Sequence, residues 1–288
     1  MFDPKTNKFP YTLETDKHYL VVEKNKGLVF DENYPYIETK KSFKFKQWLV
    51  RILLYLIVFP VYAVKMGLRI KGRKILRKNK KLLKQGVISV SNHVHMCDYI
   101  CIMNAIRPHK SNVLAWAPNI NGENGTLIRL VGGIPIPEDS YRGTKEYIKA
   151  VGTVLNNSGW LHICSEGSMW EYYCPIRPFK KGAAHFAFRY NKPIIPMAFS
   201  YRKPGWIRRK IFKQIALFTL TIGEPLFIDE SLPKEEQIED LTKRSHDAVC
   251  KLAGIDPNEN IYPPIFNHNT RIDYYTTKYG VGYTKSKK

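Results

Sequence analysis

The chain has 288 residues, of which 44% are apolar and 13% aromatic, and this excludes a disordered chain that is too polar to form a core. Its mean hydropathy of −0.33 leaves room for at most one hydrophobic segment and so excludes a polytopic membrane protein. The 46 Lys and Arg residues exceed the 25 Asp and Glu residues by 21. Such an excess predicts an anionic partner, either nucleic acid or an anionic membrane surface.

The N-terminal extension, residues 1–39, is mixed and polar, so we expect no secretory signal peptide. The cysteines are odd in number and contain no C-x-x-C pair, which predicts neither a disulfide framework nor a zinc site. Both observations fit a reducing cytoplasm. The five cysteines are Cys97, Cys101, Cys164, Cys174 and Cys250.

Residues 40–84 hold fifteen Lys or Arg and no Asp or Glu, and they enclose the apolar run Ile52–Val64. A nucleic-acid-binding arm interleaves its basic residues with polar or aromatic ones, and has no use for a continuous apolar run. Basic flanks are attracted to anionic lipids by roughly 1 kcal/mol per Lys or Arg near the surface. We therefore predict that residues 40–84 form a membrane-anchoring segment.

The apolar run covers about 20 Å as a helix, which is short of the ~30 Å hydrocarbon core. Basic clusters on both of its flanks also disfavour a crossing. We expect a helical, monotopic segment in the membrane interface at the cytoplasmic face of the cell membrane. A single span and a buried core helix are the other interpretations. Six residues of this segment repeat at helical spacing and would form one stripe: Arg51, Tyr55, Val58, Tyr62, Lys65 and Arg69. The stripe is only approximate, because Pro60 is expected to kink the helix.

Short apolar runs alternate with helical stretches over residues 85–254, which predicts an α/β domain with a mixed or largely parallel central sheet flanked by helices. The expected strands are Val87–Ser91, Val113–Ala117, Gly132–Pro137, Trp160–Ser165, Ile194–Phe199 and Ile215–Ile222. The expected helices are Tyr99–Ile106, Ser140–Leu155, Ala183–Tyr190 and Glu235–Leu252. Residues 255–288 are expected to form an irregular basic tail.

The first polar cluster follows a predicted strand and contains His93 and Asp98. Five residues apart on one helix, these side chains would point ~140° away from each other. They meet only if the chain turns between strand and helix. Asp98 would then fix one imidazole nitrogen of His93 and leave the other free as a base. A purely structural pair is the alternative interpretation.

Two further clusters have residue types suited to binding a substrate. Glu166, Gly167 and Ser168 follow another strand, in a turn that either holds a substrate through backbone N–H groups or is an ordinary loop. Lys180 and Lys181 precede a helix, where they are placed to bind phosphate together with the N–H groups of the helix end.

In this order the motifs resemble the 1-acylglycerol-3-phosphate (lysophosphatidic acid) acyltransferase family, within the glycerolipid acyltransferases. The resemblance extends over about residues 86–225. It rests on Asn92-His93-x-x-x-x-Asp98, Gly-Ile-Pro-Ile at Gly133–Ile136, Glu166-Gly167-Ser168, Phe179-Lys180-Lys181-Gly182-Ala183 and Pro193-Ile194-Ile195-Pro196.

The resemblance implies transfer of an acyl group from acyl-CoA or acyl-ACP to a lysophospholipid hydroxyl. The conversion of lysophosphatidic acid to phosphatidic acid is the first candidate reaction. His93 would take the hydroxyl proton, and Asp98 would orient the imidazole. Substrate binding would fall to Gly133 and to Glu166, Gly167 and Ser168. No acyl-enzyme, cofactor or metal is required, and no nucleic-acid partner is expected.

This chain departs from the family pattern at two arginines that are expected to bind the acceptor phosphate. Pro137-Glu138 stands where one Arg is usual, and Ser168-Met169 stands where Thr-Arg is usual. The basic residues available as substitutes are Arg142, Arg177, Lys180 and Lys181. Otherwise the acceptor is another lysolipid, or a hydroxyl or amine that lacks a glycerol phosphate.

Two other classes of protein stay open. His93-x-His95-x-x-Asp98 is similar to the metal-binding run of metallo-β-lactamase-type hydrolases, but its Asp is one place late and the next histidine is His109. A non-enzymatic basic protein that binds membranes or nucleic acid would explain the charge of residues 71–84 but not the ordered motifs.

Overall fold

The computed structural model describes residues 26–258 except 171, 174, 213 and 215. Almost all of the predicted tail, most of the N-terminal extension and Cys174 lie outside the described residues.

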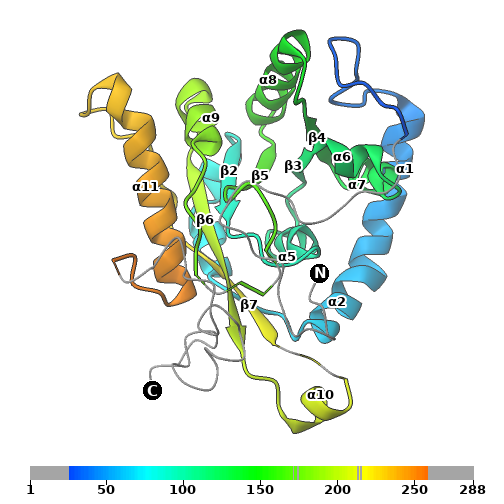
Figure 1. The fold of residues 1–288 in the computed structure, drawn as a ribbon, viewed down its shortest axis with the longest axis vertical. Coiled ribbons are helices and arrows are strands. Elements are labelled where there is room, and N and C mark those ends of the chain that lie inside the picture. Colours follow the sequence, from blue (N-terminus) through cyan, green and yellow to red (C-terminus); the bar gives the residue numbers. More distant parts are fainter. Residues whose placement is uncertain (1–25, 171, 174, 213, 215, 259–288) are drawn as a thin grey trace.

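The described chain forms a seven-stranded sheet in the order β1-β7-β6-β2-β5-β3-β4 (Figure 1). Neighbouring strands are parallel except β6 and β7, which are antiparallel. This confirms the predicted mixed α/β sheet. The strands are β1 (Arg69–Lys71), β2 (Val87–Ser91), β3 (Ser111–Trp116), β4 (Gly133–Ile136), β5 (Trp160–Cys164), β6 (Ile194–Arg202) and β7 (Leu217–Ile222).

The edge strand β1 comes from the segment that we expected to serve as the anchor. It is three residues long, and its two outer residues are exposed. It therefore lacks the apolar run by which a strand is recognised in a sequence. The sheet thus begins upstream of residue 85, and two short basic helices, α3 (Arg73–Lys78) and α4 (Lys80–Leu83), follow β1.

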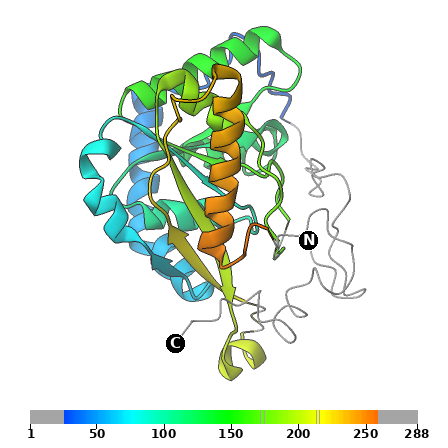
Figure 2. The same ribbon diagram turned by 90° about the vertical axis from the view of Figure 1, so that its left-hand side faces the viewer.

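Helices cover both faces of the sheet (Figures 1 and 2). Side chains alternate along β2, so Ile88 and Val90 face one core while Val87 faces the other. The first core holds α8 (Tyr141–Asn156), α9 (Gly182–Tyr190) and α11 (Lys234–Ala253), and the second holds α5 (Asp98–Ala105). Three further short helices are α6 (Ala117–Asn121), α7 (Gly125–Leu130) and α10 (Trp206–Lys210).

The predicted anchor is a continuous helix made of α1 (Lys41–Leu53), the π-helical turn η1 (Leu54–Val58) and α2 (Phe59–Lys65). The wider turn ends at Val58, two residues before Pro60, which has no N–H to donate, so the helix accommodates proline with a π turn. Residues Lys41–Lys65 are long and apolar enough to cross a membrane, and 11% of their most apolar stretch is buried. That exposure is inconsistent with a buried core helix.

The part of the stripe from Arg51 to Tyr62 lies toward the domain, whereas Lys65 at its end is exposed. Tyr55 and Tyr62 are half-buried, and the Arg107 guanidinium lies over the Tyr55 ring at 5.6 Å. The apolar side points away from the domain and is exposed, and we call it the anchor face. It consists of Phe45, Trp48, Leu49, Ile52, Leu53, Leu56, Ile57, Val61 and Val64.

Ser140 caps α8, because its Oγ accepts a hydrogen bond from the Gly143 N–H at 2.9 Å. We expect Ser140→Ala to lower the free energy of unfolding by about 1 kcal/mol, since it leaves that N–H without its acceptor. Chemical denaturation of both proteins measures the difference. Ser140→Asp keeps an acceptor and is the control, so an equal loss in both variants would contradict the capping role.

Candidate active site

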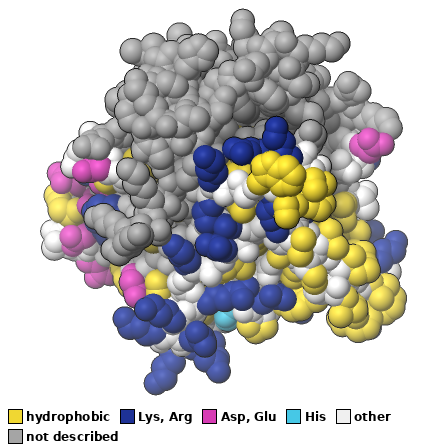
Figure 3. Space-filling view, turned by 90° about the horizontal axis from the view of Figure 1, so that it is seen from below, with side chains coloured by type: hydrophobic (Ala, Val, Ile, Leu, Met, Phe, Trp, Pro, Cys, Tyr) yellow, Lys and Arg dark blue, Asp and Glu magenta, His cyan; other side chains and the backbone are white. Residues whose placement is uncertain are grey.

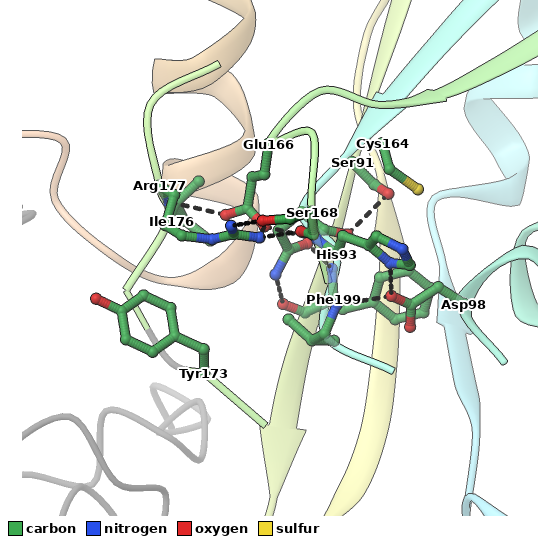
Figure 4. A network of polar contacts seen from close by, with 12 residues as sticks. Ser91, His93, Asp98, Cys164, Glu166, Ser168, Tyr173, Ile176, Arg177 and Phe199 are labelled. Atoms are coloured by element: carbon green, nitrogen blue, oxygen red, sulfur yellow. Dashed lines mark hydrogen bonds and ion pairs between the residues drawn. The ribbon is translucent and has the colours of Figure 1, made fainter. Parts of the chain in front are cut away.

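His93 lies in the loop that follows β2, Asp98 is the first residue of α5, and the two side chains meet across the turn between them (Figure 4). His93 Nδ1 is 2.9 Å from Asp98 Oδ2, and the same oxygen accepts the N–H groups of Val94 at 2.7 Å and His95 at 3.0 Å. Asp98 is buried at the start of α5, whereas the His93 side chain is 25% exposed. The loop therefore fixes one face of the imidazole and leaves part of the ring accessible.

The environment of His93 increases its affinity for a proton. Burial lowers the pKa of the imidazole, but the charge and hydrogen bonding of Cys164 and Asp98 raise it by more, so the pKa lies well above its ordinary value. The carboxylate also stabilises the imidazolium that forms when the ring takes up a proton. The pair has the chemistry of a general base.

Two buried side chains hold in place the loop that carries His93, which is the candidate catalytic loop. The Asn92 amide donates to the Phe199 carbonyl at 3.1 Å and accepts the Phe199 N–H at 2.8 Å, so it continues the ladder between β2 and β6. From the β5 side, Glu166 Oε2 accepts the N–H of His93 at 2.8 Å. Although Asn92 stands in the motif, the sequence does not indicate its role, because its partner lies 107 positions away.

Glu166 forms a buried ion pair with Arg177. Glu166 Oε1 accepts the Arg177 N–H at 2.7 Å, and Glu166 Oε2 accepts from Nη2 at 2.9 Å. Arg177 Nη1 donates to Ser168 Oγ at 2.7 Å, and the guanidinium lies 4.5 Å from the centre of the Trp170 ring. The Arg177 side chain is fully buried, so its guanidinium interacts with the protein and is not placed to bind a phosphate from solvent.

A second buried histidine lies beneath the loop, on β5. His162 Nδ1 is 2.9 Å from Ser89 Oγ, and its Nε2 is 3.3 Å from Ser91 Oγ. Burial, together with the nearby charge of His93, lowers the pKa of His162 to about 3, so the ring is neutral. Cys164 Sγ lies 3.8 Å from His162 Nε2 and beside His93 (Figure 4). The sequence motifs gave no signal for this polar layer, because its members come from two strands.

The predicted phosphate-binding residues are not gathered in one place. Lys180 lies against the Gly167 turn, where an added Cβ on Gly167 would be 3.7 Å from Lys180 Cε. Lys181 pairs with Glu239 at 2.5 Å, and Arg142 pairs with Glu32 at 3.1 Å, both on exposed surface. Of these three residues, Lys180 is the one brought next to the Glu166–Ser168 turn, where the buried Arg177 also lies.

Gly133 and the two departures from the family pattern have local structural explanations. A Cβ on Gly133 would lie 2.5 Å from Ile128 Cγ2, so packing requires glycine at this position. Gly133 lies on β4, which β5 and β3 separate from β2, the strand that leads to His93. Glu138 accepts from Trp116 Nε1 at 2.6 Å, and the Met169 side chain is buried.

His95 contacts neighbouring groups of the protein. Its Nδ1 accepts the Cys97 N–H at 3.1 Å, and its ring lies 5.7 Å from that of Phe218. Within the described residues, no three His, Cys, Asp or Glu side chains are grouped as metal ligands.

Comparison with known proteins gives the class of this protein. Residues 68–200 match the family model named Acyltransferase, so the protein is an acyltransferase. The match to this domain confirms the resemblance that the sequence motifs indicated. The crystal structure of the 1-acyl-sn-glycerophosphate (LPA) acyltransferase PlsC from Thermotoga maritima is similar with a TM-score of 0.48 at 14% identity, over 77% of this chain and 87% of that chain. A search of curated proteins finds no match.

Proposed function

We propose that the protein transfers a fatty acyl group from acyl-CoA or acyl-ACP to the hydroxyl of a lysophospholipid, with lysophosphatidic acid as the first candidate acceptor. The observation that carries this proposal is the contact between His93 Nδ1 and Asp98 Oδ2 at 2.9 Å, which leaves Nε2 of a partly exposed ring as the base.

In the proposed reaction, His93 Nε2 takes the proton of the acceptor hydroxyl as its oxygen attacks the thioester carbonyl. The tetrahedral intermediate then breaks its C–S bond, and the leaving thiolate receives the proton back from the imidazolium. Asp98 holds the ring and stabilises its positive charge. No acyl-enzyme or cofactor takes part.

The acceptor phosphate is proposed to bind near the Glu166–Ser168 turn through Lys180. Of the basic residues expected to replace the family arginines, Lys180 lies against this turn, whereas Arg177 is buried and Arg142 and Lys181 extend toward Glu32 and Glu239. Glu166 and Ser168 act by holding the turn, because their side chains are buried against Arg177.

The anchor helix is proposed to lie in one leaflet at the cytoplasmic face of the cell membrane. Its exposed anchor face and the basic residues on both flanks support this placement. Carbonate extraction followed by protease treatment of sealed vesicles tests it: a membrane-bound protein with a digested N-terminus is expected, and a protected N-terminus would contradict the monotopic arrangement.

The reaction is tested with membranes that carry the protein, a labelled acyl-CoA or acyl-ACP, and a panel of acceptors. The panel contains lysophosphatidic acid, lysophosphatidylglycerol, lysophosphatidylethanolamine and monoacylglycerol, which has no phosphate. We expect label in the product of a phosphate-bearing acceptor. If label appears only in the monoacylglycerol product, the acceptor is a lipid without phosphate and the proposed acceptor class is wrong. If no acceptor is labelled, the proposal is contradicted.

The variant Asp98→Asn is expected to shift the pH profile of kcat/KM. A base works when it is neutral, so kcat/KM of the wild type rises with pH toward the raised pKa of His93. Asp98 is one of the groups that raise this pKa, so its removal lowers the pKa of His93 and moves the rising limb to lower pH, with a lower maximum. Initial rates across pH measure the shift, and an unmoved limb would show that Asp98 does not act on the base.

A further inference from the structure

The connection between β6 and β7 protrudes from the domain and carries α10 (Figure 1). We call residues 203–212 the hairpin tip. Its four large apolar side chains are exposed: Trp206 by 64%, Ile207 by 58%, Ile211 by 63% and Phe212 by 67%. No residue of α10 is buried. A cluster of this kind marks a surface that interacts with an apolar partner.

The charge of the hairpin tip indicates what that partner is. Lys203, Arg209 and Lys210 are exposed beside the apolar side chains, and residues 194–223 contain no Asp or Glu. Tryptophan and aliphatic residues interleaved with cations are typical of segments that lie in the interface of an anionic bilayer. Nucleic acid would leave the aliphatic side chains without a partner.

The hairpin is tied to the end of the anchor helix. Arg208 Nη1 donates to the Val64 carbonyl at 2.9 Å, and the Phe218 N–H donates to the Met66 carbonyl at 3.0 Å. The side chains of Arg202 and Gln214 donate to the carbonyls of Gly67 and Lys65. The last carbonyl groups of a helix have no N–H partners within the helix, and here the hairpin supplies hydrogen-bond donors to them. These bonds hold the hairpin against the end of the anchor helix.

Seen from below, hydrophobic side chains and Lys and Arg are gathered on one face of the molecule (Figure 3). The catalytic loop is close to this region, because Val94 and Cys97 share a buried cluster with Met66 and Phe218. A surface that includes the hairpin tip and the α2 end of the anchor face therefore lies near the loop that carries His93.

We propose that the hairpin tip is a second membrane-docking element. It inserts its apolar side chains into the same leaflet as the anchor face, while Lys203, Arg209 and Lys210 contact lipid phosphates. The inference rests on the proposed membrane association of the anchor helix but not on the acyl-transfer chemistry, so binding is measured without substrates.

The test uses the full chain and vesicles of phosphatidylcholine with or without phosphatidylglycerol. Flotation of Ile211→Ser/Phe212→Ser is expected to show binding to the mixed vesicles weakened about tenfold or more, because two inserted side chains are lost. Phe227→Ser is the matched control: Phe227 is 52% exposed but follows the other end of β7, and its replacement is expected to leave binding unchanged. Binding equal to wild type in the hairpin variant would overturn the proposal.

A second pair of variants separates the two docking elements. If Leu56→Ser/Ile57→Ser weakens binding and the hairpin variant does not, the anchor stands and the hairpin proposal is overturned; if neither weakens it, both are overturned. Arg209→Gln/Lys210→Gln is expected to weaken binding only to vesicles with phosphatidylglycerol, and the difference is expected to vanish at high salt. A dimer that dissociates in the hairpin variant, with vesicle binding intact, would assign the surface to a second copy of the chain.

Discussion

Replacing His93 by alanine is expected to lower kcat by about 10²- to 10⁴-fold, which is the usual contribution of a general base. The ring is only partly buried, and its contact with Asp98 is made by Nδ1, so alanine removes the proposed base at Nε2 without opening the core. Initial rates of label transfer at equal amounts of membrane-bound protein measure the loss.

His185→Ala is the matched control for this variant. His185 is an exposed histidine on α9, outside the site, so its removal is expected to leave kcat unchanged. Full activity in His93→Ala would falsify the proposed mechanism, whereas a change confined to KM would assign His93 to acceptor binding.

The second large effect is expected at the buried ion pair. Arg177→Ala leaves the Glu166 carboxylate buried without its charged partner, and the loss of one partner of such a pair lowers the free energy of unfolding by about 3–5 kcal/mol. Because Glu166 also accepts the N–H of His93, we expect kcat to fall as the catalytic loop loses its fixed position. Unfolding in detergent and label transfer measure the two effects.

Lys181→Ala provides the comparison, because the pair between Lys181 and Glu239 is exposed. Its loss is expected to cost about 1 kcal/mol or less. Equal stability losses in the two variants would show that the Arg177 pair contributes no more than a surface pair.

The sequence predicts those parts of the fold that depend on residues close together in the chain. Runs of apolar residues predicted the positions of the central strands. Ser140 predicted the start of α8 to within one residue. The spacing of His93 and Asp98 required a turn, and the structure has one. In each case the residues that decide the structure are close together in the chain.

The parts that the sequence did not predict depend on long-range contacts. β1 has no apolar run of its own and forms by pairing with β7, 150 positions later. Arg177 has the residue type of a phosphate ligand, but its environment is set by Glu166, Ser168 and Trp170, which bury it. The direction of the anchor face was likewise fixed by packing of the opposite stripe against the domain.

The buried position of Arg177 limits how the acceptor specificity of this chain can be redesigned. Met169, which stands where the family usually has an arginine, is itself buried and adjoins Ser168, whose side chain already binds the Arg177 guanidinium. Met169→Arg would put a positive charge at a buried position between Ser168 and Trp170, both of which contact Arg177, and burying a charge without a partner is costly. Restoring the family motif by this one substitution is therefore expected to destabilise the turn that Arg177 holds.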